Sequence, residues 1–512
     1  MSKKISITLV SFLILFTYQF PNYFAFIKTP VNKFYTGTAY LFDPWDVNVY
    51  IASINWSQEF GFYFQNAYTT IPHQPVLFYP LYIFTGSLLK TVSPLLLYYI
   101  LTISSSFLLI LTIYQISKLF LSKHLYVLAS VILTTLGGGL GWYFIFRGFD
   151  SPDVTLTPFT LASAFQKPHE LLALSFYFLS LSLFYLGVNK KSTLLALASA
   201  FAFIAVIFFY PYYILSYLLI IFSYSLIVWR KEGKKEAIRL GIIITLLTLP
   251  ITILYSKYLL SSDSFGSVTS PLLSGPTLTG ILGGYGVLDI FVLLQLLNRK
   301  KTEKSLFLLI WLFTSILLTF LPFGFSRYFL RGLFFPCVLL SLMYLENPPK
   351  LFKKYEKLIY LTILFLVPLN SILIFKTRME VVKDASIRFV YINSEEKEAM
   401  DFLKNNTSPG SGVLADYILG NFIPVFTYNR VYYGHNTQTP NAPEKIVNLT
   451  KFYSNEFSDQ DAKKFLKDEG ISFIVWGPDE KQITKESGTS VLKYSFLESV
   501  FSNHLVKIFS YK

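Results

Sequence analysis

The sequence predicts a mainly α-helical, polytopic membrane protein with a small α/β domain at its C-terminal end, and three observations lead to this fold class. Of the 512 residues, 53% are apolar and only 14% are charged, whereas a soluble chain carries about 25% charged residues. The apolar residues form runs near the ~20 residues that cross a bilayer, among them 5–27, 94–116 and 357–375. Residues 377–512, in contrast, regain the charge density of a soluble domain.

The apolar runs predict eleven membrane spans within a bundle of about 11 to 13 helices. The predicted spans are residues 5–27, 95–117, 124–146, 168–187, 192–210, 212–229, 238–259, 279–298, 304–322, 329–346 and 357–376. We expect the first span to be a retained anchor, because it is too long for a signal peptide and no small-residue cleavage site follows it.

The distribution of charge predicts how the spans are oriented. Residues 1–376 hold 28 Lys and Arg against 13 Asp and Glu, whereas residues 377–512 hold 16 against 17. With eleven spans, 19 basic residues in the N-terminal segment and in alternate loops fall on one side, which is the cytoplasmic side by the positive-inside rule. The net charge of +14 is therefore a topology signal, and we expect no nucleic-acid partner. We predict a plasma-membrane protein with a cytoplasmic N-terminus and an extracytoplasmic tail.

One apolar segment, residues 74–89, does not fit this count as a full crossing, because it would invert every later loop. Pro75, Pro80 and Gly86 favour a broken, re-entrant segment on the outer side, and two short crossings with a tight turn remain an alternative. The predicted organisation is a membrane bundle over residues 1–376, with outer loops at 28–73 and 147–167, and an outer α/β domain over residues 377–512.

In the tail, periodicity and capping residues predict two helices and four strands. The first helix covers residues 394–405 with Ser394 as its N-cap, and the second covers 458–469 and ends at Gly470. The predicted strands are 413–417, 430–433, 471–476 and 505–510.

No motif of soluble nucleotide, zinc or hydrolase chemistry occurs in the sequence. The run Gly137-Gly138-Gly139-Leu140-Gly141 lies inside a predicted span, so it indicates a close helix contact or a kink rather than a phosphate-binding loop. Cys337 is the single cysteine and lies in an apolar run, where it is expected to be a small buried side chain.

The first outer loop contains acidic and aromatic residues with helical spacing. Asp46 and Tyr50 are four residues apart, so a helix would place them on one face. Asp43 stands where that helix would begin and is a candidate cap; both acids are also candidates for catalysis. His73, near Pro72 and Pro75, is either a general acid or base, a ligand, or a hydrogen-bonded surface histidine.

Further ionisable residues stand at the outer ends of spans, where charge is costly and often functional. Lys167, His169 and Glu170 lie at the start of one span, and Arg327 and Arg331 at the start of another. Paired arginines suit a lipid phosphate, although salt bridges and anchoring of helix ends are alternatives. Asp289 is an acid within a span, either an ion or proton site or a packing residue. The turn 210–213 is expected to be structural.

Several short motifs follow one another in a recognisable order. In the first outer loop these are Asp46 with Tyr50-Ile51-Ala52, then Asn66–Thr70, then His73-Gln74-Pro75, then Tyr79-Pro80-Leu81-Tyr82. Later come Gly138–Trp142, Pro168-His169, Arg327 to Gly332, Tyr432–Asn441 and Ile471–Gly477. This order resembles the GT-C superfamily of glycosyltransferases, which includes oligosaccharyltransferases, protein O-mannosyltransferases and lipid A aminoarabinose transferases. The chain is most similar to uncharacterised bacterial GT-C-like proteins.

The resemblance implies a GT-C-like catalytic bundle that transfers a sugar from a polyprenyl-phosphate donor to a glycan, lipid or protein acceptor at the outer membrane face, in contact with membrane lipids. It implies Asp46 as the catalytic carboxylate, with Asp43 as the rival. Arg327 would bind the donor phosphate, assisted by Arg331 or Lys167, while His435 would lie on the acceptor side. The cavity would be lined by Tyr50, His73, His169 and Glu170.

The resemblance also leaves points open. Val47 follows Asp46 where the family commonly has a second acid, so dependence on a divalent metal is left open, and no other cofactor is predicted. Two other functions remain as alternatives. A transporter or lipid flippase would need charged mid-span residues and an inverted repeat, and a non-catalytic membrane scaffold would need no converging polar cleft.

Overall fold

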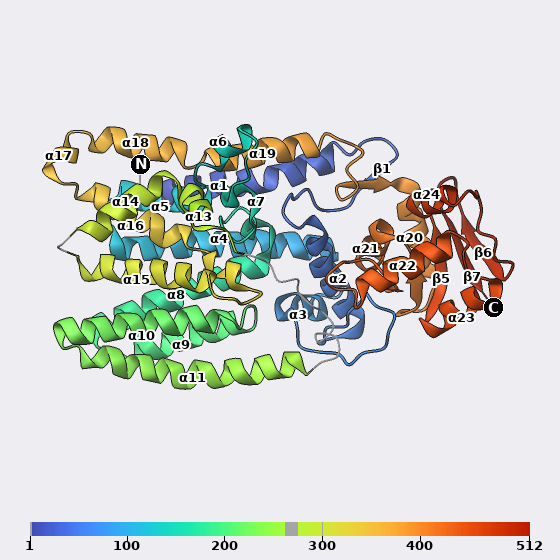
Figure 1. Ribbon diagram of the computed structural model, residues 1–512, viewed down its shortest axis with the longest axis horizontal. Helices are drawn as coiled ribbons and strands as arrows, with labels where there is room; N and C mark the ends of the chain where they lie inside the picture. Colours follow the sequence, from blue (N-terminus) through green and yellow to red (C-terminus); the bar gives the residue numbers. More distant parts are fainter. Residues whose placement is uncertain (1–2, 262–274, 299–300, 512) are drawn as a thin grey trace. The chain divides into compact units, whose positions relative to one another are not determined.

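The computed structural model describes residues 3–261, 275–298 and 301–511, and its helices are those of a multi-pass membrane protein (Figure 1). Within this part of the chain, seven helical segments are long and apolar enough to cross a membrane. They are α1 (Lys3–Ile27), α4 (Pro94–Phe120), α8 (Pro168–Lys190), α10 (Tyr213–Glu232), α11 (Lys235–Leu260), η2 with α16 (Ser326–Leu330 and Phe334–Glu346), and α18 with α19 (Glu356–Leu366 and Leu369–Val381). The predicted fold class, a mainly α-helical membrane bundle with a small α/β domain, is confirmed.

Besides η2 with α16 and α18 with α19, two more predicted spans are not single helices. Residues 124–146 form α5 (His124–Thr135) and α6 (Gly141–Phe146) with a break between them. Residues 279–298 form α13 (Leu278–Tyr285) and α14 (Val287–Leu297), which are bent by 102° at Gly286, whose φ is +59°. Shorter helices cover two other predicted spans, α9 (Thr193–Ile207) and α15 (Glu303–Thr319). Asp289 lies in the first turn of α14, not at the middle of a continuous span.

The break between α5 and α6 is organised around the buried carboxylate of Asp153 in α7 (Pro152–Thr155). This carboxylate accepts hydrogen bonds from the backbone N–H groups of Gly139 (2.7 Å) and Gly141 (3.0 Å) and from the side chain of Asn370 in α19. A Cβ on Gly139 would stand 2.2 Å from the carbonyl oxygen of Gly284. The glycine run is therefore a close contact and a kink, as the sequence predicted.

The chain forms two compact units. The first combines residues 1–21, 101–256 and 271–379, and it contains the helices from α5 to α10 and from α13 to α18. The second combines Asn22–Ile100 and Glu380–Lys512 with a short piece that begins at Lys257. One division falls between Met379 and Glu380, and the segment 28–73 groups with the tail in the second unit.

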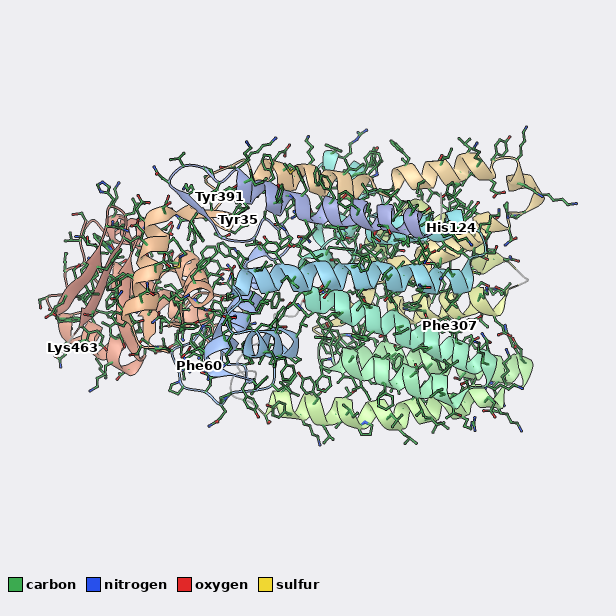
Figure 2. The ribbon with its side chains drawn as sticks, turned by 180° about the vertical axis from the view of Figure 1, so that it is seen from behind. Tyr35, Phe60, His124, Phe307, Tyr391 and Lys463 are labelled. Carbon is green, nitrogen blue, oxygen red and sulfur yellow. The ribbon has the colours of Figure 1, made fainter. Side chains whose placement is uncertain are left out.

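A two-stranded sheet ties the first outer loop to the tail within the second unit. Strand β1 (Lys33–Tyr35) pairs antiparallel with β2 (Tyr391–Asn393), and Tyr35 stands opposite Tyr391. Figure 2 labels these two side chains, whose rings are 6.2 Å apart. The phenol of Tyr391 also donates to the carbonyl oxygen of Val382 (2.9 Å).

The tail is built on a five-stranded sheet in the order β4-β3-β5-β7-β6. Strands β4 (Arg430–Val431), β3 (Gly412–Leu414) and β5 (Ile471–Trp476) are parallel, whereas β7 (Lys507–Tyr511) runs antiparallel to β5 and to β6 (Leu497–Ser502). The helices of the tail are α20 (Ser394–Asn406), α21 (Tyr417–Phe426), α22 (Ala442–Tyr453), α23 (Asp459–Asp468) and α24 (Pro478–Glu486).

The predicted tail elements are largely present, but helices α22 and α24 were not predicted, and three further details differ. The N-cap of α20 is Asn393, whose backbone N–H donates to the carboxylate of Glu396 (2.8 Å), so Ser394 is the first helical residue. Helix α21 begins at Tyr417, where a strand was predicted to end. Strand β6 was not predicted, because its burial does not follow the alternation of a half-buried strand.

Helices α2 (Pro44–Phe60) and α3 (Pro80–Leu88) complete the second unit and pack against each other. Within the segment 74–89, α3 has nine residues, too few to cross a bilayer, which takes about 20. The aromatic ring of Tyr50 on α2 stacks on Tyr82 of α3 at 5.1 Å. This packing holds the first turn of α2 against the rest of the unit.

Candidate functional site

The N-terminus of α2 places Asp46 at the edge of the tail sheet. Pro44 begins the helix and Asp43 precedes it with φ at +47°, and the Asp43 side chain makes no cap hydrogen bond. Asp46 lies in the first helical turn, where the helix dipole favours a negative charge. Its side chain is 35% exposed, so the carboxylate is partly enclosed and still open to a substrate.

Asp46 is paired with His435, which follows strand β4. The Oδ1 atom of Asp46 lies 3.2 Å from the Nε2 atom of His435, whose side chain is only 4% exposed. The two atoms are within ion-pair distance, but their alignment is not that of a hydrogen bond. The structure thus brings together Asp46, the expected catalytic carboxylate, and His435, the expected acceptor-side residue.

The tautomer of His435 follows from the contacts of its other ring nitrogen. The backbone N–H groups of Thr437 and Gln438 both point at Nδ1, at 3.3 Å each. A nitrogen that accepts hydrogen bonds carries no proton, so the proton of the neutral ring is assigned to Nε2. His435 therefore presents an N–H group toward the carboxylate of Asp46.

A chain of buried amides holds the His435 loop in place. The amide nitrogen of Asn48 on α2 donates to Asn421 on α21 (2.6 Å), and Asn421 donates to the carbonyl oxygen of Gly434 (2.7 Å). Gly434 also passes so close to α21 that a Cβ on it would lie 2.2 Å from the carbonyl oxygen of Gly420. Asn48 and Asn421 were not among the predicted site residues, because an asparagine in an apolar run carries no motif.

The other two candidates from the first outer loop have structural contacts. Tyr50 is buried and packs on Tyr79 and Tyr82. His73 accepts a hydrogen bond at Nε2 from the backbone N–H of Asn66 (2.8 Å), and its Nδ1 lies 3.0 Å from the carbonyl oxygen of Ile71. Burial lowers the pKa of His73 below 6.5. The ring thus stabilises a turn, and Asn66 links this turn to the carbonyl oxygen of Gln438 (2.7 Å).

A second cluster of predicted residues forms in the first unit. Arg331 and Glu170, 4% and 3% exposed, are joined by an ion pair of 3.0 Å, and Lys167 stands 4.0 Å from the same carboxylate oxygen. Two nitrogens of Arg331, Nε and Nη1, are buried without a hydrogen-bond partner among the described residues. A buried guanidinium with free N–H groups is suited to an anionic ligand.

Aromatic rings surround this guanidinium. Arg331 lies over the rings of Tyr210 and Tyr328 at 5.0 and 5.1 Å, and Arg327, less deeply buried, lies over Tyr328 at 5.2 Å. The ring of His169 is 5.8 Å from that of Tyr210. The turn 210–213 was expected to be structural, and its Tyr210 ring packs against the guanidinium of Arg331.

A metal ion in a protein is held by several His, Cys, Asp or Glu side chains that lie close together. Among the residues that the structure describes, no three His, Cys, Asp or Glu side chains gather where they could hold a metal ion. One partner of Asp46 in the second unit is the imidazole of His435. No step of the proposed function uses a metal ion.

Comparison with known proteins identifies the fold. No protein-family model matches the sequence, and no curated protein matches it either. The archaeal oligosaccharyltransferase AglB from Archaeoglobus fulgidus, in complex with an inhibitory peptide and a dolichol-phosphate, aligns with 93% of this chain and 69% of its own at a TM-score of 0.52 and 12% identity. Its apo form aligns over the same shares of both chains at 0.53.

A second structure, ArnT from Cupriavidus metallidurans bound to undecaprenyl phosphate, aligns with 99% of this chain and 97% of its own at 12% identity, with a TM-score of 0.45. The alignments with AglB, at 12% identity, show that the chain shares the fold of this membrane oligosaccharyltransferase.

Proposed function

We propose that this protein is an integral-membrane glycosyltransferase that moves a sugar from a polyprenyl-phosphate donor to a hydroxyl or amide of a lipid, glycan or protein acceptor. The reaction would take place at the outer face of the plasma membrane, with the N-terminus in the cytoplasm. The fold supports the class of enzyme, and the AglB structure, which contains a dolichol-phosphate, supports the class of donor.

The observation that carries the proposal is the pair of Asp46 and His435. A partly exposed carboxylate at a helix N-terminus, held beside a buried histidine N–H, is a positioned base. His435 keeps its proton on Nε2 because backbone N–H groups occupy Nδ1. It therefore orients Asp46 and stabilises its charge, and Asp46 is the group that accepts a proton.

In the proposed step, one glycosidic bond forms while one sugar–phosphate bond breaks. The acceptor oxygen or nitrogen attacks the anomeric carbon of the donor sugar and forms the new glycosidic bond. The bond between that carbon and the phosphate oxygen breaks, and its electron pair leaves with the polyprenyl phosphate. The acceptor proton passes to Asp46.

The leaving phosphate needs a cation, and we assign this role to Arg331, with Lys167 and Arg327 assisting. The free Nε and Nη1 atoms of Arg331 offer donors for phosphate oxygens, which guanidinium binds in a bidentate manner. Glu170 holds the remaining nitrogen at 3.0 Å and fixes the plane of the guanidinium. The surrounding tyrosine rings exclude water, which strengthens the interaction between charges.

The test is transfer from a radiolabelled polyprenyl-phosphate sugar pool in membranes. Loss of a general base typically costs about 10²- to 10⁴-fold in rate, so Asp46→Asn should lose nearly all transfer. Asp43→Asn removes a neighbouring, exposed carboxylate and should leave transfer nearly intact. Equal activity of Asp46→Asn and the parent would reject the base assignment, and loss in Asp43→Asn alone would move it to Asp43.

A further inference from the structure

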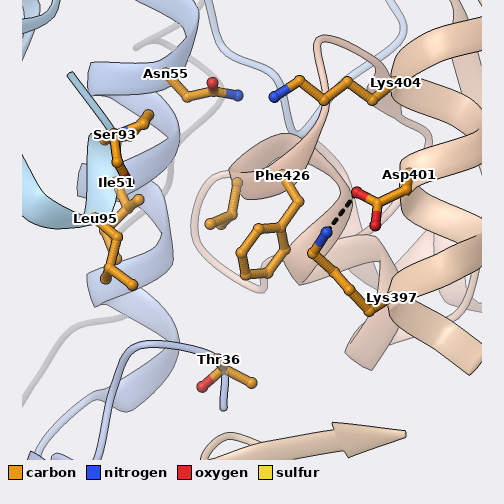
Figure 3. A pocket seen from close by; sticks show the side chains of 11 residues that line it. Thr36, Ile51, Asn55, Ser93, Leu95, Lys397, Asp401, Lys404 and Phe426 are labelled. Carbon is orange, nitrogen blue, oxygen red and sulfur yellow. Dashed lines mark hydrogen bonds and ion pairs between the residues drawn. The ribbon is translucent and has the colours of Figure 1, made fainter. Parts of the chain in front are cut away.

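A cavity of about 160 Å³ lies within the second unit, on a part of α2 that the proposed reaction does not use. Its walls come from α2, from the start of α4, from α20 and from the end of α21. A water molecule takes up about 30 Å³ in the liquid, so the cavity has room for a phosphate group and a few further atoms. Figure 3 shows its lining side chains.

One wall of the cavity is basic. Lys397, Asp401 and Lys404 follow one another at helical spacing, so they share a face of α20. Lys397 is ion-paired with Asp401, and its ammonium group lies over the rings of Phe34 and Phe426 at 5.2 and 5.5 Å. Lys404 is exposed. With two lysines and one aspartate, the lining carries one positive charge in excess.

The opposite wall is held by two buried amides of α2. Gln58 donates to the carbonyl oxygens of Leu89 and Val92, at 3.0 and 2.7 Å, and so fixes the segment that leads to Ser93. Asn55 donates to the carbonyl oxygens of Pro424 and Thr427, at 3.2 and 2.7 Å, and so fixes the end of α21. The cavity is thus formed before any ligand binds, which lowers the entropic cost of binding.

The position of the cavity indicates where its ligand comes from. Ser93, Pro94 and Leu95 line it, and Pro94 begins α4, a helix long and apolar enough to cross a membrane. The outward side chains of the first turns of α4 are apolar, with Leu96 and Ile100 53% and 51% exposed. The cavity therefore lies beside the end of this span, where a membrane helix would reach the headgroup region.

We propose that this cavity binds the phosphate of a membrane phospholipid headgroup. Lys404 supplies an exposed ammonium group, which lies over the ring of Tyr428 at 5.7 Å, Lys397 a fixed one and Ser93 a hydroxyl group. Ammonium groups form charge-assisted hydrogen bonds with phosphate, and basic pockets beside membrane spans bind anionic headgroups. The site is independent of the proposed sugar transfer, because it uses neither Asp46 nor Arg331.

The test measures the thermal midpoint Tm of the full chain in detergent as short-chain phosphatidylglycerol is titrated in. A diacylglycerol with the same acyl chains is the phosphate-free control, and inorganic phosphate is the soluble alternative. A ligand that binds only the folded state raises Tm. We expect phosphatidylglycerol to raise Tm, and the diacylglycerol and inorganic phosphate to raise it much less.

Lys404→Gln should weaken the apparent affinity for phosphatidylglycerol about tenfold, as expected for the loss of one charged hydrogen bond. Lys463→Gln, which removes the same charge from the exposed face of α23, is the matched control and should bind like the parent. Unchanged binding by Lys404→Gln, or an equal effect of the diacylglycerol, would overturn the proposal. An equal effect of inorganic phosphate would overturn the assignment to a lipid and make this a site for soluble phosphate.

Discussion

At the scale of single residues, the two ring nitrogens of His435 have different roles. Nδ1 is occupied by the backbone of its own loop, and Nε2 faces Asp46 at 3.2 Å. A histidine fixed in this way does not take up the acceptor proton without losing those contacts. We infer that it acts as a positioning residue. It holds and stabilises the carboxylate of Asp46, which is the proposed acceptor of the proton.

This arrangement predicts the effect of removing the ring. His435→Ala should lower kcat about 10- to 100-fold, with little change in the KM of the acceptor, because Asp46 loses its orienting donor.

His435→Gln is the control for this prediction, because it restores an N–H group without the ring and should recover part of the lost kcat. Equal kcat values for His435→Ala and the parent would show that His435 does not position Asp46.

At the scale of secondary-structure elements, Asp153 determines where two membrane helices break. Its carboxylate binds the N–H groups between α5 and α6 and the amide of Asn370. Burial raises the pKa of Asp153 and these hydrogen bonds lower it, with burial the larger effect. The carboxylate thus supplies acceptors to backbone groups that the broken helix leaves without partners.

Asp153→Ala should therefore destabilise the membrane bundle. Each buried donor left without a partner costs about 1–3 kcal/mol, so a clear drop in the thermal unfolding midpoint in detergent is expected. Asp153→Asn keeps one carbonyl oxygen in place and should lose less. Equal midpoints for Asp153→Ala and the parent would show that the break is stable without this residue.

The turn around His73 predicts a pH dependence of stability. Folding lowers the pKa of His73 below its unfolded value of 6.5, so the folded protein favours the neutral ring. The stabilisation is present above pH 6.5 and is lost as the pH falls through the lowered folded value. Protonation at Nε2 would also break the hydrogen bond from Asn66.

Thermal midpoints measured between pH 5 and pH 7.5 check this prediction. The parent should lose more stability toward pH 5 than His73→Gln, which does not titrate in this range. Parallel curves for the two proteins would contradict it.

Elements with a strong local pattern were predictable from the sequence. Strand β5 was predicted with its observed bounds, Ile471–Trp476, and α23 (Asp459–Asp468) lies within the predicted helix 458–469. The kink at 136–140 was predicted from the glycine run, but the bend at Gly286 was not, because hydropathy reports the burial of a segment and not the backbone geometry that interrupts it. Helix α21 was missed since its apolar run has the composition of a strand, and the cap residue Asp416 stood inside the predicted strand.

In the candidate site, the residues were predictable from the sequence but their contacts were not. Asp46 and His435 were both recognisable as polar residues in motifs, but their pairing depends on the first outer loop folding with the tail. That association is carried by β1 with β2 and by the amides of Asn48 and Asn421, which are long-range contacts without a local signal. Arg331 and Glu170 likewise meet through the packing of separate helices.

At the scale of the whole molecule, the distribution of charge gives a testable orientation. The 19 basic residues that precede or separate the spans on one predicted side contrast with a tail of 16 basic and 17 acidic residues. By the positive-inside rule, the loop after α8 should lie in the cytoplasm and the tail outside. The proposed function requires this orientation, because its catalytic carboxylate belongs to the same unit as the tail.

Cysteine labelling measures this orientation directly. Cys337 is the only cysteine and is buried, so a Cys337→Ser background leaves no native thiol. Lys463→Cys, on α23 and labelled in Figure 2, and Lys190→Cys, at the exposed end of α8, then place one thiol on each predicted side. A membrane-impermeant maleimide should label Lys463→Cys in intact cells, and Lys190→Cys only after lysis. The reverse pattern would place the tail in the cytoplasm. It would rule out sugar transfer at the outer face, because Asp46 belongs to the same unit as the tail.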